Sequence, residues 1–270
     1  MITLTPKRKF EVPLQAACVT PETFKGKTIA EIAALPVTEG VQPLKLGDVF
    51  EIAQNDAPSP DITVCGDVAK VKRIGQGMKT GEIVINGDVG MHTGEKMLGG
   101  KITINGNAGN WTGSEMKGGT IEIHGDAGDY VAAAYRGSDT GMKGGLITVD
   151  GKVGSDVATH LHGGVIKIKG GAGRFLGYHM CDGTIQVDVQ TDMRPGACMT
   201  GGKIVITGKL DEVLPSFTID SVKPKVKVDD TTSVAGPFYV FLGDLAEHGT
   251  GKLFVSKANN PHLKFYEKYL

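Results

Sequence analysis

Residues 116–125 read MKGGTIEIHG, and this phrase returns along most of the chain. Its first residue is a methionine, or once a leucine, at Met78, Met97, Met116, Met142, Leu161, Met180 and Met199. The steps between these positions are 19, 19, 26, 19, 19 and 19 residues. Spacing this regular predicts an internal repeat in which each 19-residue unit forms one turn of a larger structure.

Each phrase contains an alternation of apolar and polar residues. The fifth and seventh residues after its first residue are always isoleucine or valine: Ile83 and Ile85, Ile102 and Ile104, Ile121 and Ile123, Ile147 and Val149, Ile166 and Ile168, Ile185 and Val187, Ile204 and Ile206. The residue between them is mostly polar, as at Thr103 and Glu122. A period of two indicates a strand with one buried face, and β-branched side chains suit such a surface.

A glycine ends most of these strands, often after asparagine or aspartate, as in Asn86–Gly87. Such pairs favour turns. One unit cannot bury its own apolar face, but stacked units can, because each strand pairs in parallel with its equivalent in the next turn. We therefore predict an all-β fold, a right-handed single-stranded parallel β-helix of about seven to eight turns. Residues 62–68 read as a degenerate first turn. The frequent glycines argue against helices, and one strand per repeat argues against a propeller.

Two flanks lie outside the repeat, so we expect three regions: 1–61, 62–217 and 218–270. In the first, Thr20–Pro21 is typical of a helix start, residues 28–35 read as one or two helical turns, and residues 48–53 read as a strand. This flank is expected to cap the rod, because an open end would expose unpaired strand edges. The last region carries most of the late aromatic residues, and it is either a cap or an arm that docks on another subunit.

The one longer step places seven extra residues within Asp129–Gly141. Insertions in repeat proteins emerge as loops, often on the binding face. Tyr130, Tyr135 and Arg136 in this stretch are residue types common at interface hot spots. The candidate partner-contact residues are therefore Tyr130, Tyr135, Arg136, Phe265, Tyr266 and Tyr269. The alternative is a surface loop without a partner.

Composition excludes several classes of protein. A formal charge of −1, from 29 basic and 30 acidic residues, gives no reason to expect nucleic acid or an anionic membrane as partner. No apolar run approaches ~18 residues, so no membrane span is expected. The start, MITLTPKRKFEVPLQ, lacks the apolar stretch of a signal peptide. Cys18, Cys65, Cys181 and Cys198 show no C-x-x-C spacing. We expect a cytoplasmic protein without disulfides.

No residues form the pattern of a catalytic, cofactor-binding or metal site. His160, His179 and Cys198 occupy one repeat position in three successive turns. They would either meet a metal ion or stack as a ladder, and the straight spacing favours the ladder. The many glycines lack the strand–loop–helix context of nucleotide-binding motifs, and no local carboxylate cluster suggests a carbohydrate-active enzyme.

The repeated phrase Met-x-Gly-Gly-x-Ile-x-Ile-x-Gly resembles the C-terminal β-helix domain of the glutamate synthase large subunit. Together with the flanks, including MITLTPKRKFEVPLQA, the chain looks like a member of the formylmethanofuran dehydrogenase C-subunit family. That resemblance implies a structural, non-catalytic component of a complex that reduces carbon dioxide and condenses the product onto methanofuran, the first step of methanogenesis from carbon dioxide.

The same resemblance implies the partners and places all cofactors on them. The partners would be a dehydrogenase subunit with a tungsten or molybdenum pterin, an amidohydrolase subunit with its metal site, and ferredoxin-like subunits with iron–sulfur clusters. Two alternatives stay open: the gamma subunit of a bacterial formyltransferase/hydrolase complex, and a free-standing glutamate synthase-like scaffold.

Overall fold

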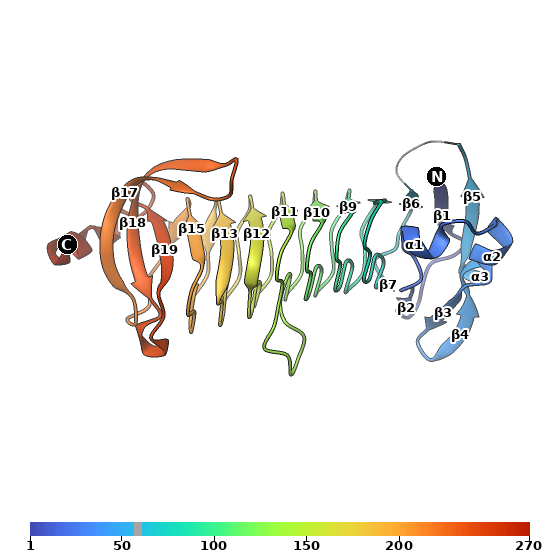
Figure 1. The fold of residues 1–270 in the computed structure, drawn as a ribbon, viewed down its shortest axis with the longest axis horizontal. Coiled ribbons are helices and arrows are strands. Elements are labelled where there is room, and N and C mark those ends of the chain that lie inside the picture. The colour runs from blue at the N-terminus through green and yellow to red at the C-terminus, as the bar shows by residue number, and fades with distance from the viewer. Residues whose placement is uncertain (57–60) are drawn as a thin grey trace.

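The computed structural model describes residues 1–56 and 61–270. Most of the chain forms one elongated stack of strands, with the N-terminal segment at one end and the C-terminal segment at the other (Figure 1). A sheet of 13 strands runs through the stack in the order β17-β18-β19-β15-β13-β12-β11-β10-β9-β8-β6-β1-β5. The fold is mostly β, as predicted, with a large parallel sheet at its centre.

One strand of each repeat contributes to this sheet. These strands are β6 (Ile62–Cys65), β8 (Glu82–Asn86), β9 (Lys101–Ile104), β10 (Thr120–Ile123), β11 (Leu146–Val149), β12 (His162–Ile168), β13 (Asp182–Val187) and β15 (Lys203–Ile206). Each pairs in parallel with the next, and Ile102 lies opposite Ile121. The pairing of Ile62 with Ile83 confirms that residues 62–65 form a strand of the repeat ladder.

A second, shorter ladder runs beside the first. It was not predicted, because only one strand per repeat was expected. Its members are parallel bridges through Val68, Val89, Ala108, Ala127, Val153, Ala172 and Thr191. Thr191 belongs to the two-residue strand β14 (Gln190–Thr191), which pairs in parallel with β16 (Lys209–Leu210) and continues the ladder. The two-residue strand β7 (Val71–Lys72) follows Val68 at the other end. Two or three residues are too few for an alternation to be visible in the sequence, so only the spacing of small apolar residues signals this ladder.

The rest of each turn is a tight bend with left-handed backbone. In one turn Trp111, Gly113 and Glu115 have φ of 58°, 67° and 53°. The second glycine of the phrase is required by its backbone and its surroundings. Gly119 has φ of +90°, and a Cβ there would lie 2.8 Å from the Gly100 carbonyl oxygen. Only glycine avoids both problems, which explains why it recurs in every repeat.

The core consists of the predicted columns. The methionines and Leu161 that begin each phrase are fully buried, as are the isoleucines and valines of the long ladder. Ile123 is 1% exposed, whereas Glu122 points outward and pairs with Lys101 at 2.9 Å. Polar side chains join neighbouring turns on the outside: Asp88 Oδ1 accepts from the Asn107 amide, and Asn107 Oδ1 accepts from the Asp126 amide. These residues therefore bridge turns rather than only shape their own bend.

The N-terminal segment extends both ladders. β1 (Ile2–Pro6) pairs with β6 and with β5 (Phe50–Gln54), while β2 (Leu14–Gln15) joins β7 to a small sheet with β3 (Pro36–Glu39) and β4 (Gln42–Lys45). This pairing covers the first turn of the stack.

Three short helices lie within the described residues 1–56. α1 (Pro21–Phe24) starts after Thr20, and α2 (Ile29–Ala33) after Thr28, so both predicted helical turns are present. The strand predicted over 48–53 is wrong at its start. Leu46–Val49 forms the helical turn α3, and the Asp48 carboxylate caps it by accepting from the Lys45 amide. The strand β5 begins at Phe50.

The C-terminal segment continues the long sheet. β19 (Gly251–Ser256) pairs in parallel with β15, and β18 (Ser233–Gly243) and β17 (Thr218–Lys227) follow in antiparallel order. Phe238, Tyr239 and Phe241 are buried here, so these aromatic side chains pack within the chain itself. The 3₁₀ helices η1 (Leu245–Glu247) and η2 (Pro261–Tyr269) complete the chain. Within residues 1–56 and 61–270, no helix is long and apolar enough to cross a membrane.

Candidate functional site

One face of the stack carries a column of aromatic side chains. The first left-handed position of each bend holds Arg73, His92, Trp111, Tyr130, Asp156, Phe175 and Arg194. Because turns stack at about 4.8 Å, side chains at one position lie over one another. The ring of Trp111 stacks on Tyr130 at 4.5 Å with 6° between the planes, and on His92 at 5.4 Å with 5°. We call these seven residues the aromatic column.

The seven extra residues form a loop beside this column. The backbone follows the ordinary turn through Ala134, whose amide bonds the Thr159 carbonyl, and returns to it at Met142. Residues 135–141 are therefore the insertion, and they form the loop that protrudes next to β11 in Figure 1. The repeat spacing alone places the insertion within 129–141, and the structure narrows it to 135–141.

The loop packs back onto the column. The Tyr135 ring lies 5.7 Å from His92 and 5.9 Å from Trp111, and the Arg136 guanidinium lies 5.9 Å from the Trp111 ring. The Tyr135 amide also donates to Glu115 Oε1 at 3.3 Å. The structure thus gathers the predicted Tyr130, Tyr135 and Arg136 around Trp111, which is 8% exposed. Trp111 and His92 were not predicted, although the spacing of 19 residues from His92 to Trp111 to Tyr130 could have revealed them.

A pocket of about 230 Å³ opens between the loop and the next turns. Trp111, Tyr130, Tyr135 and Arg136 line one side, and Asp156, Thr159, His160 and Tyr178 line the other. Among the residues that the structure describes, none donates a hydrogen bond to the Asp156 carboxylate or pairs with it. Burial, and then the charge of Asp129, raises the pKa of Asp156. The pocket therefore combines flat aromatic surfaces with an unsatisfied acceptor.

His160 and His179 form a stacked ladder at the third left-handed position. Their rings are 4.9 Å apart with 5° between the planes. Burial lowers the pKa of His160, and the neighbouring His179 lowers it further. Cys198 follows in the next turn, where its backbone amide donates to Asp244 Oδ2 and burial raises the pKa of its thiol. The stacking predicted for this position is thus present between His160 and His179.

A buried polar cluster lies at the N-terminal end of the column. Glu95 is 4% exposed, forms an ion pair with Arg73 and accepts from Gln76 Nε2 at 3.2 Å. His92 Nδ1 lies 3.5 Å from Glu95. Burial, with the positive charges of Arg73 and Lys72, lowers the pKa of His92 to about 4. His92 is therefore neutral at pH 7, and this cluster stabilises the bend beneath the loop.

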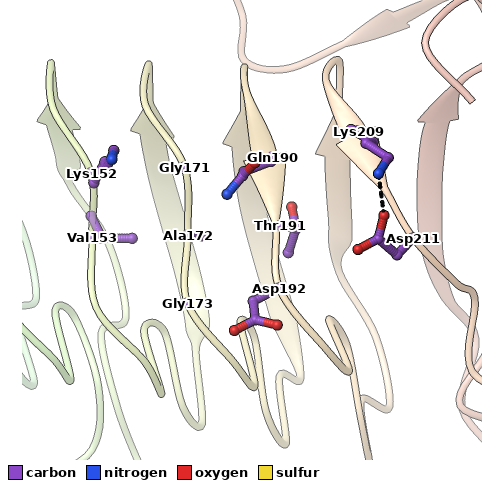
Figure 2. A pocket seen from close by; sticks show the side chains of 10 residues that line it. All are labelled: Lys152, Val153, Gly171, Ala172, Gly173, Gln190, Thr191, Asp192, Lys209 and Asp211. Carbon is purple, nitrogen blue, oxygen red and sulfur yellow. Dashed lines mark ion pairs between the residues drawn. The ribbon is translucent and has the colours of Figure 1, made fainter.

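A second, shallow groove of about 300 Å³ follows the short ladder on another side of the stack (Figure 2). Gly171 and Gly173 leave the space, and Lys152, Gln190, Asp192, Lys209 and Asp211 surround it. Lys209 pairs with Asp211 at 2.6 Å, which is the dashed line in Figure 2. With lysines and aspartates interspersed, the groove does not favour ligands of one charge.

The remaining predicted contact residues lie far from the loop, in η2 at the C-terminal end of the stack (Figure 1). Tyr266 packs edge-on against Phe241 at 5.0 Å, and Phe265 stacks on Tyr266 at 4.2 Å. Phe265 and Tyr269 are 54% and 63% exposed. The structure therefore separates the six candidates into two groups, one at the loop and one at the C-terminal end.

The donor side chains do not suit a bound metal centre. Within the described part of the chain, no three His, Cys, Asp or Glu side chains gather as metal ligands do. An iron–sulfur cluster needs several cysteine ligands together, whereas Cys18 lies in the N-terminal segment, Cys65 on β6, and Cys181 and Cys198 in later turns.

Comparison with known proteins decides the family. The chain is 49% identical over 266 residues to the C-subunit of the tungsten-containing formylmethanofuran dehydrogenase 2 of Methanococcus maripaludis, and the match covers 96% of this chain and 98% of the relative. The chain belongs to the formylmethanofuran dehydrogenase C-subunit family.

Another member and a solved structure agree with this assignment. The C-subunit of the molybdenum-containing formylmethanofuran dehydrogenase 1 of Methanothermobacter marburgensis is 46% identical over 91 residues, 34% of this chain and 23% of that protein. A chain of the crystal structure of the formyltransferase/hydrolase complex FhcABCD from Methylorubrum extorquens, solved with methylofuran, matches with a TM-score of 0.83 and 29% identity. That match covers 94% of this chain and 99% of the other. No family model matches the sequence.

Proposed function

We propose that this chain is a non-catalytic structural subunit of a formylmethanofuran dehydrogenase complex, which reduces carbon dioxide and fixes it onto methanofuran. The observation that carries the proposal is the match to the C-subunit of the Methanococcus maripaludis enzyme along 96% of the chain. The side-chain chemistry supports it, because the polar clusters described above serve to stabilise bends and to join turns.

We further propose that the repeat region, residues 62–217, is a right-handed single-stranded parallel β-helix, with 1–61 and 218–270 as separate terminal regions. Two parallel ladders whose partners lie one repeat apart support this architecture. A stack of this kind is rigid along its length, since every turn is hydrogen-bonded to the next. Such rigidity suits a subunit that fixes the relative positions of others.

The partners follow from the same proposal. They are a pterin-containing dehydrogenase subunit, an amidohydrolase subunit and ferredoxin-like subunits, with methanofuran as the substrate of the complex. Tungsten or molybdenum, iron–sulfur clusters and the amidohydrolase metal would all reside on those subunits. We place the complex in the cytoplasm, supported by the four cysteines, which are all free.

Specific docking needs features that differ from turn to turn, because regular repeats look alike. The loop 135–141 with its aromatic residues and the exposed end of η2 are the candidates. Tyr135 and Arg136 on the loop, and Phe265 and Tyr269 on η2, expose side chains of the types that dominate binding energy at interfaces.

A second candidate is the equivalent subunit of a bacterial formyltransferase/hydrolase complex. The TM-score of 0.83 to a chain of the Methylorubrum extorquens complex favours it. The lower identity of that match, 29% against 49%, places it behind the methanogen enzyme.

An activity assay on two preparations tests the proposal. The full chain purified alone is expected to show no formylmethanofuran turnover, while the same chain tagged in its native host and purified anaerobically should carry the activity with its partners. Turnover by the chain alone would refute the non-catalytic role. A tagged chain that purifies without partners or activity would refute the assignment to the complex.

A further inference from the structure

The pocket beside the loop has walls that suit a flat group. One face of the Tyr130 ring is covered by Trp111, and among the described residues no ring stacks on its other face. Asp156 takes the next place in the aromatic column, between Tyr130 and Phe175. Tyr178 lines the opposite side and is itself held edge-on by Phe175 at 5.7 Å and His179 at 4.2 Å. The stacked rings of the aromatic column are thus interrupted at Asp156, and the uncovered face of Tyr130 lies beside this gap.

The charges around the gap favour a cation. The Asp156 carboxylate lines the pocket without a donor or an ion-pair partner in the described part of the chain. Three further carboxylates interact electrostatically with residues that line the pocket. Asp129 does so with Asp156, Asp139 with His160, and Glu247 with Tyr178. Arg136 is the cation that lines the pocket, and it lies over Trp111. His160 adds no positive charge at pH 7, because burial lowers its pKa.

We propose that this pocket receives the guanidinium group of an arginine on another subunit of the complex. A planar guanidinium can stack on Tyr130 and donate two parallel hydrogen bonds to the Asp156 carboxylate, which an ammonium cannot do in the same geometry. The inference rests on the proposed function, which supplies the partner subunit, and adds the chemistry by which that partner is held.

A direct binding test uses the single tryptophan of the chain, Trp111, which lines the pocket. The full chain is titrated with acetyl-Gly-Arg-Gly-amide, and with the same peptide carrying citrulline, which keeps the shape and removes the charge. The arginine peptide is expected to change Trp111 fluorescence saturably, and the citrulline peptide is not. Asp156→Asn should weaken the response roughly 10-fold or more. An equal response to both peptides, or no response that depends on Asp156, overturns the proposal.

The variant Asp156→Asn is expected to preserve the fold, because asparagine suits the backbone at this position. Asp156 has a left-handed φ of 58°, and asparagine adopts this backbone readily. An unchanged melting temperature would confirm that only the charge has been removed. Asp220→Asn on β17 is the matched control, because Asp220 is an exposed aspartate at the C-terminal end of the sheet.

Assembly of the native complex supplies the second test. Tagged full chains with the native sequence, Asp156→Asn and Asp220→Asn are expressed in the host, and the retained partner subunits are measured as salt is increased. Asp156→Asn should retain roughly 10-fold less partner than the control. Equal retention by all three overturns this inference and leaves the proposed function standing, whereas loss of partners from the native chain itself overturns the proposed function. Self-association that depends on Asp156 would show that the occupant is a second copy, and would also overturn the proposal.

Discussion

Ile121 on β10 lies directly opposite Ile147 on β11, although 26 residues separate them instead of 19. The register of the long ladder is therefore unchanged by the insertion, and all seven extra residues leave the stack at one bend. The isoleucine columns continue without a gap, since both side chains are fully buried. This separation between a regular core and an irregular loop explains why the two can be altered independently.

Deletion of residues 135–141 is expected to leave the fold intact, because it restores the ordinary spacing between Ala134 and Met142. The variant should melt within a few degrees of the native chain, and its Trp111 emission should shift to longer wavelength as Tyr135 and Arg136 no longer cover the ring. Removal of Tyr130–Arg136 is the contrasting control. It takes away Val131 and Ala132, which are fully buried, and should unfold the protein. Equal stability of the two deletions would show that the insertion has been placed wrongly.

Ile123→Asp is expected to prevent folding, while Glu122→Lys is tolerated. The first change buries an unpaired charge in the ladder and should cost at least about 4 kcal/mol. The second loses the exposed ion pair with Lys101, which contributes less than about 1 kcal/mol. Soluble yield and circular dichroism of the two variants measure the difference. Similar losses in both would contradict the strand phase described here.

Asn260→Ala should cost about 3 kcal/mol. The buried Asn260 accepts from the Leu210 amide at 2.8 Å and donates to the carbonyls of Gly208 and Ser256 at 2.9 Å each, so three backbone groups would lose their partner. Asn259→Ala, next in the chain, removes one hydrogen bond of an exposed residue and should cost less than about 1 kcal/mol. Urea unfolding of both variants decides whether Asn260 holds the end of the short ladder.

Stability is expected to fall as the pH is lowered from 6.5 to 4, in part because of His92. The folded-state pKa of His92 is lowered to about 4, so in this window the unfolded chain binds a proton that the folded chain does not. The loss attributable to His92 is about 3 kcal/mol. Burial raises the pKa of Glu95, which acts in the opposite direction. His92→Phe keeps a ring on Trp111 and removes the titration, so its urea midpoint should depend less on pH than that of the native chain. Identical pH profiles would exclude this role.

The repeat made most of the fold predictable, because period and strand alternation are both visible between Met78 and Ile206. The short ladder was not predictable in the same way, since Val89 or Ala108 alone carries no alternation. The helical turn at Leu46–Val49 was missed because a single turn capped by Asp48 leaves no periodic pattern.

The candidate site was only partly predictable. Tyr135 and Arg136 stand out because they interrupt the repeat, whereas Trp111, Tyr130 and Asp156 lie at an ordinary repeat position. Their importance arises from the fold, which stacks successive turns and brings the loop back over Trp111. Phe265 and Tyr269 remain predicted contacts, and their exposure is compatible with that role.

The role proposed for this chain is to hold the subunits of a formylmethanofuran dehydrogenase complex together without taking part in catalysis. The size-exclusion profile of that enzyme from a host strain lacking this chain, compared with a strain in which the full chain is restored, tests this role. We predict that the catalytic subunits elute as separate, smaller particles without the chain and as one large particle with it. Elution of an intact, fully active complex of unchanged subunit arrangement in the absence of the chain would contradict the proposed role.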